Sequence, residues 1–222
     1  MSAPRITKIS QSKLRESAYT MLRDAFNRGE FAPGETVTMR GLAEQLGISM
    51  TTVREAVRRL VAEGCLIDTP SRKLEVPSFD TRRVQDLRDA RLALELLVLK
   101  ESVARIDTAA IDALEEIVNR PRPPGLTGPD LEANYDFHFS LYRHAGSEVL
   151  LPIINALWLQ YGSHLNRIIN HADASKIDEH VHHVEIIAAL RNADGAAAEA
   201  ALRKDIERSF RILLSPGNAV KA

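Results

Sequence analysis

The sequence predicts a mostly α-helical protein in which a small helix-turn-helix unit with a β-hairpin wing precedes an all-α antiparallel helical bundle. Two observations lead to this fold class. Apolar residues recur at helical spacing through most of the 222 residues. The only short strand-like segments are "CLIDT" and "KLEV", on either side of the turn "PSR". We therefore expect two domains, residues 1–77 and residues 78–222.

The composition limits the class of protein. Hydrophobic residues make up 45% and charged residues 27% of the chain, which is typical of a globular protein. No apolar run approaches the roughly 18 residues needed to span a bilayer, and the first ten residues lack the apolar core of a signal peptide. We therefore expect a cytoplasmic protein without a membrane partner. The single cysteine, Cys65, excludes an internal disulfide and a cysteine-based zinc site.

Three helices are predicted in the first domain. Ser12 and Gly29 are the start and stop signals of the first, Thr38 and Gly47 bound the second, and Ser49 caps the third. The apolar residues of the third helix form one stripe that faces a core: Val53, Ala56, Val57, Leu60 and Val61. Two helices joined by a tight turn, the second with an arginine-bearing polar face, predict a helix-turn-helix.

The polar face of the third helix is suited to the major groove of DNA. Thr51 and Thr52 lie in its first turn, where helix N-termini and hydroxyl groups meet phosphates or base edges. Arg54 can make a bidentate contact with guanine. Residues 1–77 carry a net charge of +3 and residues 78–222 of −4, a balance that permits contact with nucleic acid. The alternative is a solvated helix face. The predicted DNA-contacting residues are Arg40, Ser49, Thr51, Thr52, Arg54, Arg72 and Lys73.

The stretch "LAEQLGISMTTVREAVRRLVAEGCLIDTPSRKLEV" resembles the winged helix-turn-helix of GntR-type bacterial transcription regulators. The resemblance implies a homodimer that binds a two-fold symmetric operator, and a regulator that is usually a repressor. Met50 stands where the family usually has Arg, Thr52 where it usually has Pro, and Lys73 where a wing glycine is common. These departures concern the operator sequence, because Arg40, Arg54, Arg72 and Lys73 remain as DNA-contacting groups.

The second domain reads as helix almost throughout. The expected helices are 81–105, 108–119, 130–145, 147–171, 175–192 and 195–214, and the Pro/Gly-rich loop "RPRPPGLTGP" separates the second from the third. Helices of this length joined by short loops predict a compact antiparallel bundle.

Four polar residues lie on apolar stripes of these helices: Asn134, His138, His183 and Asp205. Buried polar groups must be paired or coordinated, and one metal ion can accept oxygen and imidazole nitrogen together. The alternative is a hydrogen-bonded polar core without metal, or an exposed His183. His180 and His183, three residues apart, can also chelate as a pair, although the family register described below favours His183.

Arg91 also lies on an apolar stripe, with Leu87, Leu94 and Val98. A buried arginine requires an anionic partner. Glu95, four residues later, can provide it within the helix, and the carboxylate of an effector can provide it from outside. The sequence favours neither.

The second domain resembles the FCD effector-binding domain of the FadR subgroup of GntR regulators. The resemblance rests on "DLRDARLALE" (86–95), "NYDFHFSLYRHAG" (134–146) and "HVEIIAALRNADGAAAEAALRKDI" (183–206). In metal-binding members the ligands are an Asp four residues before a His, then two further His. Here His138 and His183 match, Asn134 replaces the Asp, and Asp205 replaces the last His.

The resemblance therefore implies a divalent ion, Zn²⁺, Ni²⁺ or Mn²⁺, with a small organic acid as effector beside it. One alternative is a metal-free sensor of the acyl-CoA type. Another is a helical-bundle metalloenzyme that uses His138, His183 and Asp205. Against an enzyme, the sequence has no H-E-x-x-H motif and no evident general base beside the ligands.

Overall fold

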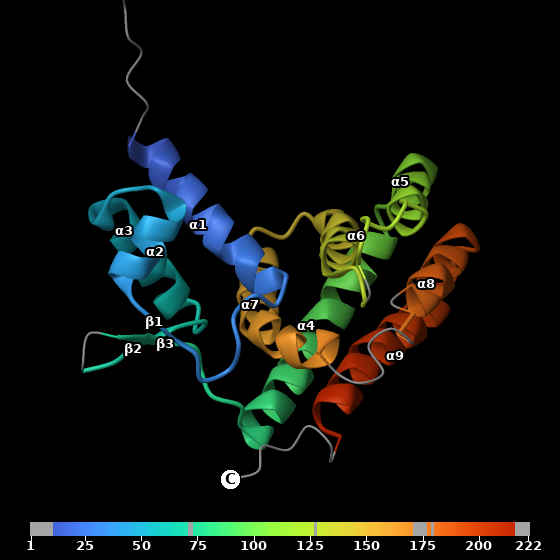
Figure 1. Ribbon diagram of the computed structural model, residues 1–222. Coiled ribbons are helices and arrows are strands. Elements are labelled where there is room, and N and C mark those ends of the chain that lie inside the picture. The colour runs from blue at the N-terminus through green and yellow to red at the C-terminus, as the bar shows by residue number, and fades with distance from the viewer. Residues whose placement is uncertain (1–10, 71–72, 127, 171–176, 179, 216–222) are drawn as a thin grey trace, which may run out of the picture.

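The computed structural model describes residues 11–70, 73–126, 128–170, 177–178 and 180–215, and these form a small head and a larger helical bundle (Figure 1). The head contains the three helices and the wing of the prediction, with a third strand added. Its elements are α1 (Gln11–Asn27), β1 (Thr36–Val37), α2 (Met39–Leu46), α3 (Met50–Ala62), β2 (Ile67–Asp68) and β3 (Leu74–Glu75).

The predicted signals of α2 and α3 are confirmed. The Thr38 side chain accepts a hydrogen bond from the Gly41 amide, and the Ser49 side chain accepts one from the Thr52 amide, so each satisfies a free N–H at a helix start. Gly47 ends α2 at φ 64°, a left-handed conformation that favours glycine. The prediction for α1 was wrong at its start, because Ser12 lies within the helix and not at its cap.

The wing is a three-stranded antiparallel sheet in the order β1-β3-β2, whereas the sequence predicted two strands. Glu75 of β3 lies opposite Thr36 of β1 and opposite Ile67 of β2. The added strand β1 is only two residues long, too short for a periodic signal. Its pairing with β3 joins the segment between α1 and α2 to the end of the head.

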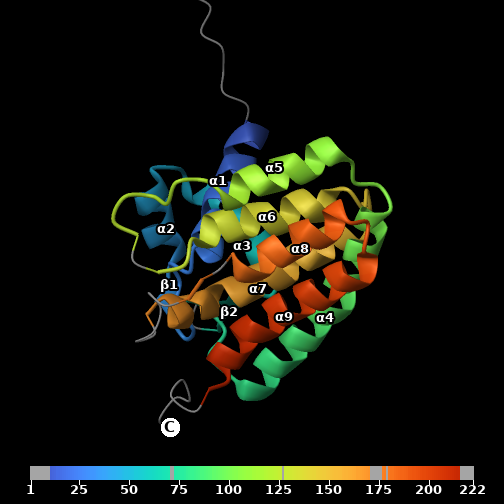
Figure 2. The same cartoon turned by 90° about the vertical axis from the view of Figure 1, so that its right-hand side faces the viewer.

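The bundle consists of α4 (Thr81–Val103), α5 (Thr108–Val118), α6 (Leu131–Arg143), α7 (Leu150–Ile169), α8 (Val181–Arg191) and α9 (Gly195–Leu213). The long helix α4 packs against α6, α7 and α9, and α8 lies between α5 and α9 (Figure 2). The helix predicted at 175–192 begins later than expected, at Val181, because residues 177 and 178 are not helical. None of the helices in the described ranges is long and apolar enough to cross a membrane.

Helix α7 contacts both the bundle and the head. The head's hydrophobic core is built from residues between Ala18 and Val76, with one addition: Leu159 of α7, fully buried. Gly162, one turn later, lies against α1 so closely that a Cβ atom there would be 2.4 Å from the backbone oxygen of Phe26. The absence of a side chain at Gly162 therefore allows α7 and α1 to touch backbone to backbone.

Candidate functional site

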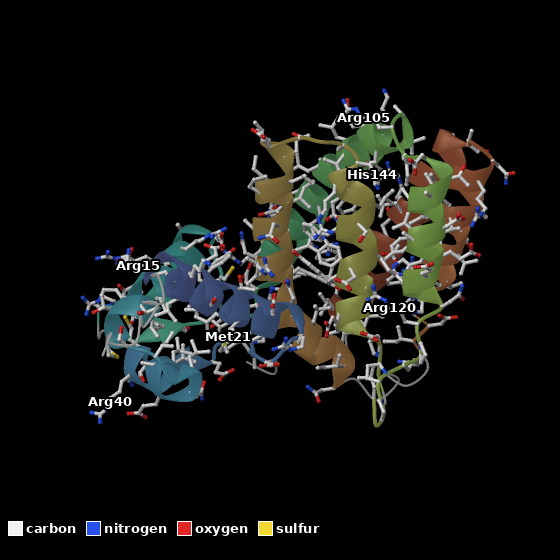
Figure 3. The ribbon with its side chains drawn as sticks, turned by 90° about the horizontal axis from the view of Figure 1, so that it is seen from above. Arg15, Met21, Arg40, Arg105, Arg120 and His144 are labelled. Carbon is white, nitrogen blue, oxygen red and sulfur yellow. The ribbon has the colours of Figure 1, made fainter. Side chains whose placement is uncertain are left out.

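Four of the predicted DNA-contacting residues lie in the first turns of α3 or at its cap: Ser49, Thr51, Thr52 and Arg54. Thr51 and Arg54 are exposed. Ser49 and Thr52 are joined through their hydroxyl oxygens, 2.9 Å apart, so both belong to the cap as well as to the surface. Arg40 on α2 extends from the outer end of the head, away from the bundle (Figure 3).

Charge pairing distinguishes the arginines of α3. Arg58 is paired with Glu55 at 2.9 Å. Arg59 stacks over the Tyr19 ring, 3.5 Å from its centroid, and is paired with Glu63. Among the residues that the structure describes, Arg54 has no ion-pair partner. Its guanidinium is thus the one on α3 that is most available for a base edge.

The other predicted contacts within the described residues come from α2 and the wing. Arg40 pairs with Glu44 at 2.9 Å, but its side chain is 84% exposed, so this pair is weak and easily exchanged for a phosphate. Lys73 is exposed in the wing. Arg72 lies outside the described residues.

Inside the bundle, three of the four predicted metal ligands meet. His138 of α6, His183 of α8 and Asp205 of α9 are buried and each offers a ligand atom within 4.8 Å of the others. His138 Nε2 lies 3.2 Å from His183 Nε2 and 3.1 Å from Asp205 Oδ2. The fourth, Asn134, is half-buried one turn before His138, and it lines the same pocket as Asp205.

The hydrogen bonds behind His138 determine which ring nitrogen carries its proton. The Tyr142 hydroxyl donates to Glu95 Oε2 at 2.7 Å, so its oxygen accepts from His138 Nδ1 at 3.0 Å. Burial, followed by the nearby Glu95 carboxylate, raises the pKa of Tyr142 well above its ordinary value, which keeps the hydroxyl a donor. With the proton on Nδ1, the lone pair of Nε2 points into the cluster. This is the arrangement of a metal-ligating histidine.

Burial keeps the His183 ring neutral. Its ring is stacked on Phe137 with 4.1 Å between centroids. Burial, followed by the proximity of His138, lowers its pKa well below the ordinary value. Its Nδ1 lies 3.1 Å from His180 Nδ1, which leaves Nε2 facing His138. The predicted alternative, a chelating pair of His180 and His183, would use this outer nitrogen and not the one in the cluster.

Asp205 supplies the negative charge of the cluster. Burial opposes its ionisation, but the neighbouring groups His138, His183 and Arg208 lower its pKa on balance. Arg208 donates to its second oxygen at 2.9 Å. Two imidazole nitrogens and a carboxylate oxygen at this spacing require a proton or a cation between them. The donor set fits Zn²⁺, Ni²⁺ or Mn²⁺.

Next to the cluster lies a pocket that contains Arg91. Arg91 has the partner within its helix that the sequence allowed, because its guanidinium pairs with Glu95 at 2.5 Å. The residue also lines the pocket. The other residues that line it are Asn134, Trp158, Tyr161, Asp205, Arg208 and Ser209, with Pro129, Leu131, Leu165, Ile168, Ile177 and Ile212 as apolar walls.

Sequence reasoning missed the residues that support the ligands. Tyr142 and Glu95 were not predicted as parts of the site, nor was Arg208. The signal was present in part, because Tyr142 follows His138 by four residues and therefore lies on the same helix face. That Glu95, 47 residues earlier, accepts the Tyr142 hydrogen bond depends on the fold.

A helix-turn-helix head with an arginine-bearing exposed face, joined to a helical bundle with a buried cluster of two histidines and an aspartate, is the architecture of a DNA-binding transcription regulator. Comparison with known families agrees. Residues 14–72 match the model of bacterial regulatory proteins of the gntR family, and residues 86–208 match the FCD domain. The chain belongs to the GntR family of transcription regulators, in the group with an FCD domain. It is a DNA-binding regulator and not an enzyme.

Individual relatives are similar over most of their length. The HTH-type transcriptional regulator McbR of Escherichia coli K12 is 26% identical over 201 residues, which cover 89% of this chain and 91% of McbR. An uncharacterized HTH-type regulator of Streptomyces ambofaciens is 29% identical, over 88% of this chain and 83% of its own. The solved structure of E. coli McbR/YncC superposes with a TM-score of 0.82 at 25% identity, covering 93% and 98% of the two chains.

Proposed function

We propose that this regulator is a homodimeric repressor whose bundle holds a divalent metal ion and responds to a small organic acid. The observation that carries the proposal is the convergence of two imidazole lone pairs and a carboxylate in the buried cluster of His138, His183 and Asp205. Asn134 is the fourth proposed ligand, through its amide oxygen. A metal would supply Lewis acidity and two positive charges at the pocket wall.

Charge favours an acid as the effector. Asp205 is the only charged ligand in the proposed set, so a divalent ion leaves the site net positive. Arg91, whose charge is paired with Glu95, lines the pocket beside it and offers an anion a charge-assisted hydrogen bond. Binding of the acid must differ between the DNA-bound and free conformations if it is to control the head.

Two exposed apolar positions support a dimer through the bundle. Leu97 of α4 is 45% exposed and Ile153 of α7 is 46% exposed, and α4 and α7 pack against each other. A second copy would cover them. A two-fold dimer would present two heads to a symmetric operator, and paired half-sites double the number of bases read.

The metal is tested by elemental analysis of protein purified without chelator. Wild type should hold about one ion per chain, and Asp205→Ala should lose both the metal and the response of operator binding to effector. Asn134→Asp should bind metal more tightly and the anion less tightly, because it adds a negative charge. Wild-type protein that is metal-free, and takes up none on titration, would contradict the metal site and favour the metal-free acyl-CoA type of sensor.

The dimer is tested by sedimentation of the full chain. Leu97→Glu introduces a charge at the proposed interface and should shift wild-type dimers toward monomers at micromolar concentration. Glu101→Leu, one turn further along α4, is a control at an exposed position. A Leu97→Glu protein that remains fully dimeric places the interface elsewhere.

A further inference from the structure

Two buried hydrogen-bond donors in the effector pocket have no partner among the described residues. They are Nη1 of Arg91 and the indole Nε1 of Trp158. Arg91 is 2% exposed and Trp158 is 2% exposed, and both line the same pocket next to Asp205. A buried donor without an acceptor destabilises the folded chain, so two in one pocket need an explanation.

The unpaired nitrogen of Arg91 is fixed in position. Glu95 accepts from Nε at 2.5 Å and from Nη2 at 3.3 Å, and this pairing leaves Nη1 as the free corner of the guanidinium. The guanidinium also lies over the Trp158 ring, 4.2 Å from its centroid, and 4.5 Å from that of Tyr161. A planar ion that packs against two rings and is paired with Glu95 cannot turn to find another acceptor.

Trp158 is also fixed. Its ring makes edge contacts with Tyr135 and Phe139 at centroid distances of 5.8 and 5.6 Å. The indole and the guanidinium therefore form one rigid unit with two N–H donors. The acceptor that best satisfies two neighbouring donors, one of them charged, is a carboxylate, with two oxygens and about four lone-pair sites.

We infer that the effector, whose existence rests on the function proposed above, is a monocarboxylate with an apolar ring or chain. Its carboxylate accepts hydrogen bonds from Arg91 Nη1 and Trp158 Nε1. Its apolar part lies along the walls made by Leu131, Leu165, Ile168 and Ile212. A polyhydroxylated acid is disfavoured, because any hydroxyl group that faces these apolar walls would be buried without a partner.

The metal strengthens this binding without being required for it. In the pocket, Arg91 is balanced by Glu95 and Arg208 by Asp205, so the two pairs leave no net charge for an added anion. A divalent ion at the cluster adds two positive charges, and a carboxylate and the ion should then raise each other's affinity.

The protein provides its own probe, because Trp158 is the only tryptophan in the chain. Full-length protein, loaded with Zn²⁺ or stripped with EDTA, is titrated with hexanoate and cyclohexanecarboxylate while tryptophan emission is recorded. Hexanol and cyclohexylmethanol are neutral counterparts of similar size that do not absorb in this range. The carboxylates should bind Zn²⁺-loaded protein at least about tenfold more tightly than the alcohols, since a hydrogen bond to a charged group contributes about 1.5–3 kcal/mol.

Trp158→Phe removes the indole N–H donor and keeps an aromatic ring at this position. Because this variant has no tryptophan, its binding is measured by calorimetry. It should weaken carboxylate binding about tenfold, leave alcohol binding unchanged, and leave the apoprotein at least as stable as wild type, because no hydrogen bond is lost. Tyr135→Phe changes a ring that contacts Trp158 but does not line the pocket; it keeps both donors and should bind the carboxylates like wild type.

The outcomes distinguish this inference from the proposed function. If carboxylates bind only the Zn²⁺-loaded protein and Trp158→Phe binds them like wild type, the ligand sits on the metal and the inference is wrong while the proposed function stands. If Trp158→Phe loses affinity but EDTA changes nothing, the inference stands and the metal-linked response fails. Equal affinity for acids and alcohols, or no saturable binding of either acid at millimolar concentration, overturns the inference.

Discussion

Replacing Tyr142 by phenylalanine tests the support behind the metal cluster. The hydroxyl takes part in two buried hydrogen bonds, to Glu95 at 2.7 Å and from His138 at 3.0 Å. A hydrogen bond to a charged group contributes about 1.5–3 kcal/mol, and a buried donor left without a partner costs about 1–3 kcal/mol. We expect Tyr142→Phe to lower the free energy of unfolding of the metal-free protein by about 3 kcal/mol.

The same change should weaken metal binding. Without the Tyr142 oxygen, His138 loses the acceptor that holds its proton on Nδ1, and its ring is free to adopt the other tautomer or to turn. Loss of an outer partner of this kind typically lowers metal affinity 10–100-fold. Competition with a chelating indicator measures Zn²⁺ affinity, and denaturant titration in EDTA measures stability.

Tyr135→Phe is the matched control. Tyr135 lies on the same helix, two turns before Tyr142, and its hydroxyl donates to the neutral Asn155 side chain at 3.0 Å. Its loss should cost about 1 kcal/mol and leave the Zn²⁺ affinity unchanged. If Tyr142→Phe binds Zn²⁺ as tightly as Tyr135→Phe does, the tautomer of His138 is not set by this hydroxyl and the reasoning is refuted.

Three further predictions concern pH, DNA and the contact between head and bundle. Burial, followed by Arg83 and Arg167, lowers the pKa of His164 from 6.5 to about 4. Between pH 6.5 and 4 the unfolded chain binds a proton at this histidine that the folded chain does not. The free energy of unfolding should therefore fall as the pH falls, by up to roughly 3 kcal/mol. His164→Gln should flatten this pH dependence, measured by urea titration. Arg54→Ala should reduce discrimination between operator and mismatched DNA by about 1–3 kcal/mol. Lys73→Ala should weaken binding to every sequence and reduce the slope of log affinity against log salt concentration by about 1. If the two variants behave identically in gel shifts, Arg54 does not read a base and Lys73 a phosphate as assigned. Gly162→Ala should destabilise the protein by about 1–3 kcal/mol, because its Cβ meets a backbone atom. Gly195→Ala, with no contact closer than 3.7 Å, should not destabilise it. Equal melting temperatures of the two variants would show that α1 and α7 can move apart without loss of stability.

Local signals in the sequence were sufficient where the structure depends on neighbours along the chain. Thr38, Gly47 and Ser49 act within one turn of where they stand, so the helix boundaries around the recognition helix could be predicted. His138 and His183 could be placed on inward faces by the helical repeat alone, and the family resemblance supplied the reason to connect them.

The rest depends on contacts between distant segments. Strand β1 is defined by pairing with Leu74 and Glu75, almost forty residues away, and two residues carry no period. Glu95 could be predicted as a partner of Arg91 at one turn's distance, but its link to Tyr142 requires α4 and α6 to be packed together. Leu159 is one apolar residue among many on α7, and its neighbours in the sequence do not indicate that it packs into the core of the head.

The position of Leu159 bears on how such regulators can be recombined. A chimaera made by cutting near residue 77 and grafting this head onto a relative's bundle would keep every DNA-contacting residue and still lack one side chain of the head's own core. The grafted bundle must offer an apolar residue in place of Leu159 and, one turn later, a residue small enough to replace Gly162. Compatible exchange partners can therefore be selected by comparing this short part of α7, even when the two linkers are alike.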